Sequence, residues 1–213
     1  MQRFVLPPLA QHNIIVIDPA HGGPENGAQL SDSLSEKDAT LALASRLRSV
    51  LQSHNFTVVL TRDGDPAAGL TTDQRAEIAN HSAAIACIVI HATATGNGVH
   101  LFTSSLQPKS KQALLPWATA QAGFVQQSGD LSGQLQTALY RDHLAAAQAQ
   151  FSISPLDNLA CPAVAIELAP LATDGDTKAA GPGDDNYQQR VAESLATALV
   201  FWRGHFDPSA GAQ

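Results

Sequence analysis

The sequence has few positive charges and no long apolar run, and each shortage argues against a class of protein. Lysine and arginine total 12 against 19 aspartates and glutamates, for a formal net charge of -7. We do not expect a nucleic-acid partner, because phosphate binding needs clustered positive charge. No apolar run approaches the roughly 18 residues of a membrane span, and the first residues lack the apolar stretch of a secretion signal. We therefore expect neither a membrane span nor a signal peptide in this chain.

Cysteine is also scarce. The two cysteines, Cys87 and Cys161, both lie in apolar, strand-like runs, and their spacing does not match a structural zinc site. A disulfide between them is one possibility, but two buried free thiols are the expectation that we favour.

What the sequence does contain is an ordinary globular composition. The chain has 213 residues, of which 44% are apolar and 15% charged, enough for one well-packed core. No linker or charge run divides it, so we predict a single domain over 14–203, with a lead-in at 1–13 and a tail at 204–213.

Short apolar runs alternate with segments of helical periodicity along the chain. Strands are predicted at 14–18, 56–61, 85–90, 98–103, 151–153 and 162–166. Helices are predicted from Glu36 to about 53, from 71 or 72 to about 81, over 109–149 with a turn near 128–130, and over 187–202, the last after a loop at 174–186. This alternation predicts an α/β fold, a three-layer sandwich with a largely parallel central sheet flanked by helices.

Four side chains that can bind a metal or move a proton are predicted to meet at one edge of this sheet. His21 follows the first strand, His91 ends a second strand and Glu167 ends a late strand. Glu36 opens the helix that follows the first strand. Since open α/β sheets bind ligands at the carboxyl ends of their strands, these four groups are the candidate site.

Two imidazoles and one carboxylate, with water in the fourth position, form a known catalytic zinc set. We therefore predict one Zn²⁺ held by His21, Glu36 and His91, with Glu167 as the base that takes a proton from the attacking water. Gly22 and Gly23 would let the backbone turn tightly beside the first ligand.

Each of these residues also has a structural alternative. A histidine at a strand end is often only hydrogen-bonded, and a glutamate in a first helical turn often only interacts with the helix dipole. The other histidines have no comparable setting and are predicted to be surface or capping residues: His12, His54, His81, His100, His143 and His205.

The order of the motifs adds a family resemblance over Ile14 to Trp202. Segments 17–24 and 34–38 resemble the first zinc motif and the glutamate-ligand segment of the N-acetylmuramoyl-L-alanine amidases, and 88–92 resembles the second histidine motif. Segments 60–65 and 75–80 match family stretches that we interpret as structural. Segment 161–168 resembles the catalytic-glutamate strand, and 187–192 the closing helix.

This resemblance implies hydrolysis of the amide between N-acetylmuramic acid and L-alanine in peptidoglycan or a muropeptide, in the cell envelope. It assigns the metal to His21, Glu36 and His91 and the base role to Glu167. The chain departs from the family pattern at Ala20, at Thr93 and in segments 144–147, 154–156 and 169–172. These departures concern substrate recognition, so two alternatives stay open: a peptidoglycan-binding or regulatory module without catalysis, and a zinc peptidase acting on a cell-wall fragment.

Overall fold

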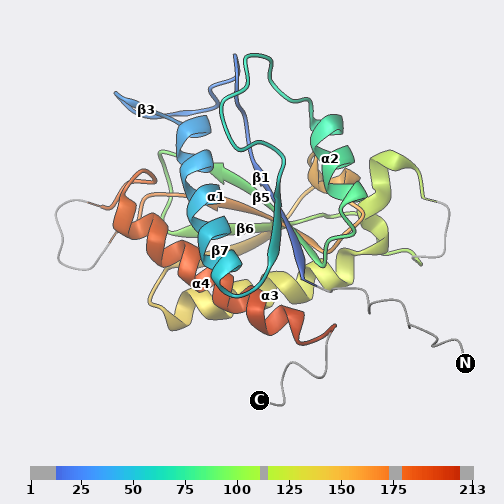
Figure 1. Ribbon diagram of the computed structural model, residues 1–213. Helices are drawn as coiled ribbons and strands as arrows, with labels where there is room; N and C mark the ends of the chain where they lie inside the picture. Colours follow the sequence, from blue (N-terminus) through green and yellow to red (C-terminus); the bar gives the residue numbers. More distant parts are fainter. Residues whose placement is uncertain (1–12, 111–114, 173–178, 207–213) are drawn as a thin grey trace, which may run out of the picture.

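A six-stranded sheet forms the centre of the molecule in the computed structural model, which describes residues 13–110, 115–172 and 179–206 (Figure 1). Its strand order is β4-β1-β5-β8-β6-β7. All neighbouring strands run parallel except β6 and β8, which are antiparallel. The bounds are β1 Ile14–Pro19, β4 Thr57–Leu60, β5 Ala86–Ala92, β6 Val99–Thr103, β7 Ala146–Gln150 and β8 Ala163–Leu168. The predicted α/β fold with a largely parallel central sheet is confirmed.

The central strands are buried on both faces, which explains their continuous apolar sequences. In β5, Ile88 and Ile90 pack into a core on one side of the sheet, and Cys87 and Val89 pack into a core on the other. Both cores therefore fix the position of the strand whose end carries His91.

Three long helices cover the first face: α1 Glu36–Ser53, α3 Val125–Arg141 and α4 Asp185–Arg203 (Figure 1). In α1 the apolar stripe is Leu43, Leu47 and Leu51, all fully buried against the sheet. This packing places the first turn of α1, which begins with Glu36, beside the carboxyl end of β1.

The second face is covered by a thinner layer. It holds α2 Thr72–His81 and two short 3₁₀ helices, Trp117–Gly123 and Leu156–Asn158. Thr71 caps α2 in a reciprocal capping box with Gln74, in agreement with the predicted start of this helix. On this face, Val89 and Ala165 border a small cavity near the carboxyl ends of β5 and β8.

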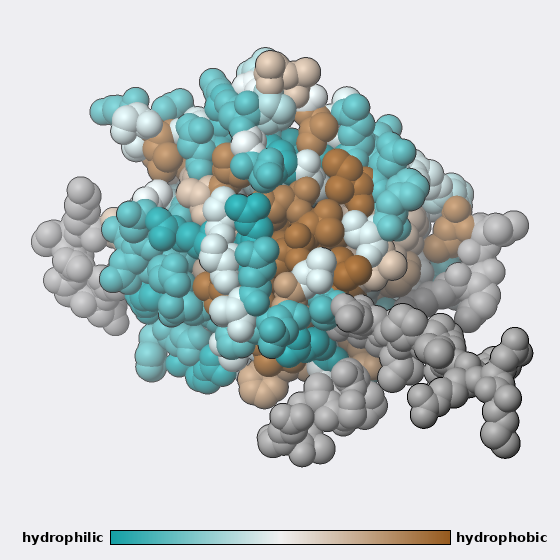
Figure 2. All heavy atoms as spheres, viewed as in Figure 1, coloured by the Kyte–Doolittle hydropathy of each residue, from teal (hydrophilic) through white to brown (hydrophobic). Residues whose placement is uncertain are grey.

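A small hairpin, β2 Gln29–Ser31 and β3 Leu34–Ser35, precedes α1. In the central sheet, β4 is the edge strand next to β1, and its residues 58–60 are half-buried. Apolar side chains gather between α1 and α2 in this view of the surface, over β4 (Figure 2). No helix within the described ranges is long and apolar enough to cross a membrane.

The predicted helical layout of 109–149 is wrong in three places. Before α3, residues 109–110 and 115–116 have no regular structure and Trp117–Gly123 is a 3₁₀ helix. The expected turn at 128–130 lies inside α3, because Leu131, Leu135 and Leu139 are fully buried and hold the segment in one continuous helix. Residues 146–150 form β7 instead of helix. Alanine and glutamine favour helices, but backbone pairing with β6 overrides this weak preference. Residues 151–153 were expected to be a strand and have no regular structure, while residues 111–114 lie outside the described part.

The prediction of free thiols is also wrong, since Cys87 and Cys161 form a disulfide across neighbouring strands. Cys87 lies on β5, and Cys161 lies two residues before β8, with 6.2 Å between their Cα atoms. Both residues are buried. Composition could not reveal this pairing, because the two cysteines are 74 residues apart in sequence and meet only because β5 and β8 are adjacent.

Candidate active site

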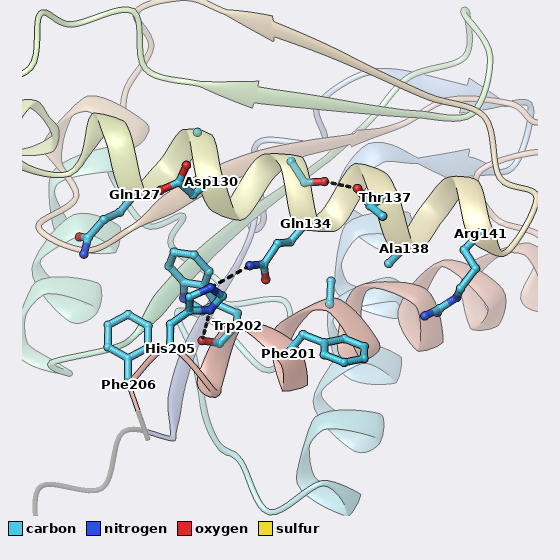
Figure 3. Close-up of a pocket in the computed structure, with 13 residues that line it drawn as sticks. Gln127, Asp130, Gln134, Thr137, Ala138, Arg141, Phe201, Trp202, His205 and Phe206 are labelled. Atoms are coloured by element: carbon cyan, nitrogen blue, oxygen red, sulfur yellow. Dashed lines mark hydrogen bonds between the residues drawn. The ribbon is translucent and has the colours of Figure 1, made fainter. Parts of the chain in front are cut away.

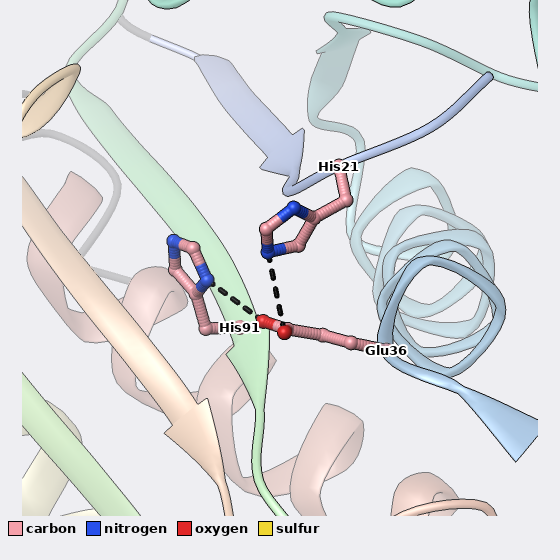
Figure 4. Close-up of side chains that lie close together, drawn as sticks. All are labelled: His21, Glu36 and His91. Carbon is pink, nitrogen blue, oxygen red and sulfur yellow. Dashed lines mark hydrogen bonds and ion pairs between the residues drawn. The ribbon is translucent and has the colours of Figure 1, made fainter. Parts of the chain in front are cut away.

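Three of the four predicted site residues meet in one cluster at the carboxyl ends of β1 and β5. His21 comes from the loop after β1, Glu36 from the start of α1 and His91 from β5 (Figure 4). One nitrogen or oxygen of each residue lies within 4.8 Å of the others. The histidines are about 30% exposed as side chains, whereas Glu36 is 7% exposed. The cluster therefore has a buried carboxylate at its base and imidazoles open to solvent.

Glu36 is held by contacts to both of its oxygens. Oε2 lies 3.2 Å from His21 Nε2 and accepts from the Ala28 N–H at 2.9 Å. Oε1 lies 2.8 Å from His91 Nδ1 and accepts from the Ala92 N–H at 3.2 Å. Burial raises the pKa of Glu36, but the contacts with His21 and His91 and the two backbone hydrogen bonds outweigh it and hold the pKa well below its usual range. The carboxylate is therefore charged at neutral pH, as a metal ligand must be.

Arg75 of α2 holds the backbone of the His21 loop. His21 itself has a left-handed backbone, with φ of 62°. The Arg75 guanidinium donates to the carbonyls of Pro19 (2.8 Å) and His21 (2.6 Å) and pairs with Asp18 at 2.7 Å. Arg75 and Asp18 are both buried, so this pair ties the second face of the sheet to the first ligand.

Arg62, which follows β4, holds the same loop from another side. Its guanidinium donates to the carbonyls of Pro19 (2.9 Å), Ala20 (3.0 Å) and Lys37 (2.8 Å). Burial and the nearby charge of Arg75 lower the pKa of Arg62. These contacts agree with the interpretation of segments 60–65 and 75–80 as structural. Arg62 and Arg75 both bind backbone carbonyls of the loop that carries His21.

Gly27 leaves the space that two of the clustered side chains occupy. Its φ is +68°, and a Cβ at this position would lie 2.6 Å from both Glu36 Oε2 and His21 Cδ2. A side chain here would therefore push directly into the cluster. Gly22 and Gly23 also have positive φ, in agreement with the tight turn predicted beside His21.

The chemistry and spacing of the donors fit a zinc ion. Ligand atoms of a tetrahedral ion with bonds of about 2.1 Å lie about 3.4 Å apart. The three donor atoms lie within 4.8 Å of one another, and the two nitrogens contact different oxygens of Glu36, at 3.2 and 2.8 Å. The backbone hydrogen bonds to Glu36 supply the outer contacts that usually orient a metal-binding carboxylate.

Glu167 lies beside this cluster, on the strand next to His91. The two residues are register partners on β5 and β8, so their side chains project from the same face of the sheet. Both border a cavity of about 110 Å³, with a mostly apolar lining of Val89, Phe102, Phe151, Ile153, Ser154, Pro155, Leu156, Ala165 and Ile166. Glu167 is not one of the three clustered donors.

His100 was predicted to be a surface or capping residue, and this prediction is wrong. It lies on β6 opposite Glu167, and its Nδ1 is 2.9 Å from Glu167 Oε1. Its sequence signal was weak, because the antiparallel pairing of β6 with β8 cannot be read from either segment alone. His54, His81, His143 and His205 are exposed, in agreement with the prediction, and His12 lies outside the described residues.

A larger groove of about 840 Å³ lies between α3 and α4 (Figure 3). Gln134, Arg141, Phe201 and Trp202 are among its lining residues, and none of the four predicted site residues borders it. Its walls hold no metal-ligand cluster like that at the sheet edge. The candidate active site is therefore the edge formed by β1, β5 and β8.

The family model and the similar proteins of known function agree on one family. The model of the N-acetylmuramoyl-L-alanine amidase family matches residues 15–200. A germination-specific N-acetylmuramoyl-L-alanine amidase from Bacillus subtilis is 29% identical over 205 residues, covering 88% of this chain and 78% of that protein.

Solved amidase structures share the fold. An N-acetylmuramyl-L-alanine amidase from Mycobacterium smegmatis superposes with a TM-score of 0.72 at 19% identity, covering 91% of this chain and 97% of the other. The catalytic domain of the amidase CwlV from Bacillus (Paenibacillus) polymyxa gives 0.66 at 21% identity, with 89% and 97% covered. With the family match spanning nearly the whole described domain, the chain belongs to the N-acetylmuramoyl-L-alanine amidase family.

Proposed function

We propose that this amidase works with one Zn²⁺ held by His21, Glu36 and His91, and that Glu167 is its general base. The substrate is the amide between N-acetylmuramic acid and L-alanine in peptidoglycan or a muropeptide. The observation that carries the proposal is the meeting of two imidazoles and a charged, buried carboxylate beside a second carboxylate on the adjacent strand.

When bound, zinc would supply Lewis-acid chemistry, activating water and stabilising negative charge on the carbonyl oxygen. Glu36, kept ionised by its hydrogen bonds, would hold the ion together with the imidazoles. Glu167 would accept a proton from the attacking water and return it to the leaving amine of L-alanine. The half-exposed position of Glu167 at the mouth of the small cavity suits a group that must reach both water and substrate.

We further propose that the enzyme acts in the cell envelope, where its polymer substrate lies. The disulfide between Cys87 and Cys161 supports this location, because disulfides form and persist in oxidising compartments outside the cytosol.

Substitutions of the proposed base and of a proposed metal ligand should have different effects on metal binding and on turnover. Glu167→Gln should keep its zinc and lose turnover by at least about a hundredfold, as expected for removing a general base. His91→Ala should lose zinc affinity because a ligand atom is missing. Zinc content by elemental analysis and release of stem peptides from purified cell wall would measure both effects.

Three results would contradict these roles. Turnover of Glu167→Gln at the wild-type rate would remove Glu167 from the mechanism, and full zinc retention in His91→Ala would remove that ligand. Stoichiometric zinc with no release of product from cell wall would instead favour a binding module.

A zinc peptidase on a cell-wall fragment is the second candidate function, favoured by the departures from the family pattern next to the site. Segment 154–156 replaces a region where the family often has arginine, and Ser154 to Leu156 border the cavity next to Glu167. The mass of the released product would separate the two activities. Cleavage between sugar and alanine leaves an intact stem peptide, whereas a peptidase shortens it.

A further inference from the structure

A row of three polar side chains crosses the second face of the sheet, next to the small cavity. His91 on β5 pairs in register with Glu167 on β8, and Glu167 pairs in register with His100 on β6. Register partners project on the same side, so Glu167 is flanked by an imidazole on each side. The first imidazole belongs to the metal cluster, and the second contacts Glu167 directly through Nδ1 and Oε1 at 2.9 Å.

The His100 ring is itself held in place. Gly96 lies close against it: a Cβ at position 96 would be 2.7 Å from His100 Cε1 and 3.3 Å from Nε2. Gly96 has φ of +93°, so the turn between β5 and β6 both requires glycine and brings its backbone against the ring. The Phe102 ring contacts His100 edge-on, with 6.3 Å between centroids. The imidazole therefore has little freedom to turn away from Glu167.

The proposed base role determines which nitrogen of His100 must carry a proton. A carboxylate that is to take up a proton only accepts hydrogen bonds, so in this role Nδ1 of His100 is the donor. Oε1 of Glu167 thereby accepts one hydrogen bond that fixes the orientation of the carboxylate. A fixed orientation matters because a displacement of about 1 Å in a catalytic group lowers rates by about a hundredfold.

We propose that His100 is a positioning residue for Glu167: through the Nδ1–H it holds the carboxylate in the orientation that accepts the proton of the attacking water. This inference rests on the proposed base role of Glu167. His100 binds neither the metal nor the substrate in this role, and its own proton stays on Nδ1 throughout the reaction.

Two substitutions at position 100 distinguish positioning from other roles. The amide nitrogen of asparagine can occupy nearly the place of Nδ1 and donate the same hydrogen bond, but asparagine cannot pass on a proton. Phenylalanine keeps the ring shape without the donor. We expect His100→Phe to lower kcat by about 10- to 100-fold with KM and zinc content unchanged, and His100→Asn to recover most of that loss.

The exposed histidine at the end of α1 provides a matched control, and His54→Asn should have wild-type kcat. Equal loss in His100→Asn and His100→Phe would overturn the proposal, because it would mean that the imidazole itself transfers a proton. Wild-type kcat in His100→Phe would overturn it as well. Thermal unfolding of each variant shows whether a loss comes from misfolding instead.

A measurement that does not use enzymatic activity keeps this test independent of the proposed function. Nitrogen NMR of the zinc-loaded protein should show His100 protonated at Nδ1, and Glu167→Leu should release that preference. A wild-type protein that shows the Nδ1–H but cuts no cell wall would refute the proposed function and leave the contact standing. An Nδ1 without a proton would refute the positioning role even in an active enzyme.

Discussion

At the residue scale, the site depends as much on a missing side chain as on the ligands that are present. Glu36 occupies the centre of the cluster, and Gly27 packs against the carboxylate from the side that faces the His21 loop. The N–H of the next residue, Ala28, donates to the same carboxylate. The segment before α1 therefore both shapes the cluster and supplies one of its hydrogen bonds.

This packing predicts the effect of adding a single methyl group at position 27. Gly27→Ala should lower zinc affinity by at least about tenfold, because its Cβ would displace Glu36 and His21 and because alanine is strained at this positive φ. Zinc titration with a competing chelator would measure the loss. Gly129→Ala in α3, where an added Cβ meets nothing within 4 Å, is the matched control. Unchanged zinc affinity in Gly27→Ala would contradict the described geometry.

At the scale of elements, α2 and the loop after β4 act on the metal cluster without belonging to it. Each contributes one buried arginine to the backbone around His21. The donors of Arg75 reach two carbonyls and a carboxylate at once, which the single ammonium of lysine cannot do with the same geometry. The position of the first ligand is therefore set by contacts between elements that are far apart in sequence.

Arg75→Met should lower both stability and zinc affinity. Removing one partner of a buried ion pair leaves Asp18 uncompensated, which costs about 3–5 kcal/mol. Loss of the His21 carbonyl contact should weaken zinc binding by about 10- to 100-fold, the range seen for outer contacts of metal sites. Urea unfolding and zinc titration would measure the two effects. A variant with normal zinc affinity would show that Arg75 acts on stability alone.

The disulfide predicts a second effect at this scale. Cross-linking residues 74 positions apart stabilises a fold by about 2–4 kcal/mol, mainly by restricting the unfolded chain. Cys87→Ala combined with Cys161→Ala should lower the free energy of unfolding by this amount in denaturant titration. Reductant should produce a similar loss in the wild-type protein and none in the double variant. A wild-type unfolding midpoint that does not change when reductant is added would contradict the disulfide.

At the scale of the whole molecule, the proposed metal joins three segments that also pack against one another in the fold, since β1 pairs with β5 and α1 packs on both. The three ligands come from a loop after β1, from α1 and from β5. An ion bound to all three exists only in the folded protein, so its binding free energy adds to stability. Zinc should therefore act on folding as well as on catalysis.

Removing the metal should lower the melting temperature. With free zinc at about 100 times its Kd, the stabilisation is about 2.7 kcal/mol, and a domain of this size shifts by about 2–4 °C per kcal/mol. A zinc-loaded sample should thus melt about 5–10 °C above a chelator-treated one in calorimetry. His91→Ala should show little of this dependence. Identical melting with and without zinc in the wild-type protein would contradict a metal bound by these three residues.

The alternation of strands and helices, and the donor types at the ends of particular strands, could be predicted from the amino-acid sequence. The central strands could be predicted because burial on both faces demands continuous apolar residues such as those of 14–17 and 85–90. His21, Glu36 and His91 could be predicted to converge because each follows or opens an element of a parallel sheet. These patterns involve residues close together in sequence, so they can be recognised without knowing the tertiary structure.

Features that depend on neighbours distant in sequence could not be predicted and became known from the three-dimensional arrangement of the strands. Residues 146–150 have a helical composition and become a strand because β6 offers backbone partners. Cys87 and Cys161 join because β5 and β8 are adjacent. His100 meets Glu167 because β6 pairs antiparallel with β8 in one register, and a shift of one residue would have turned its side chain to the other face.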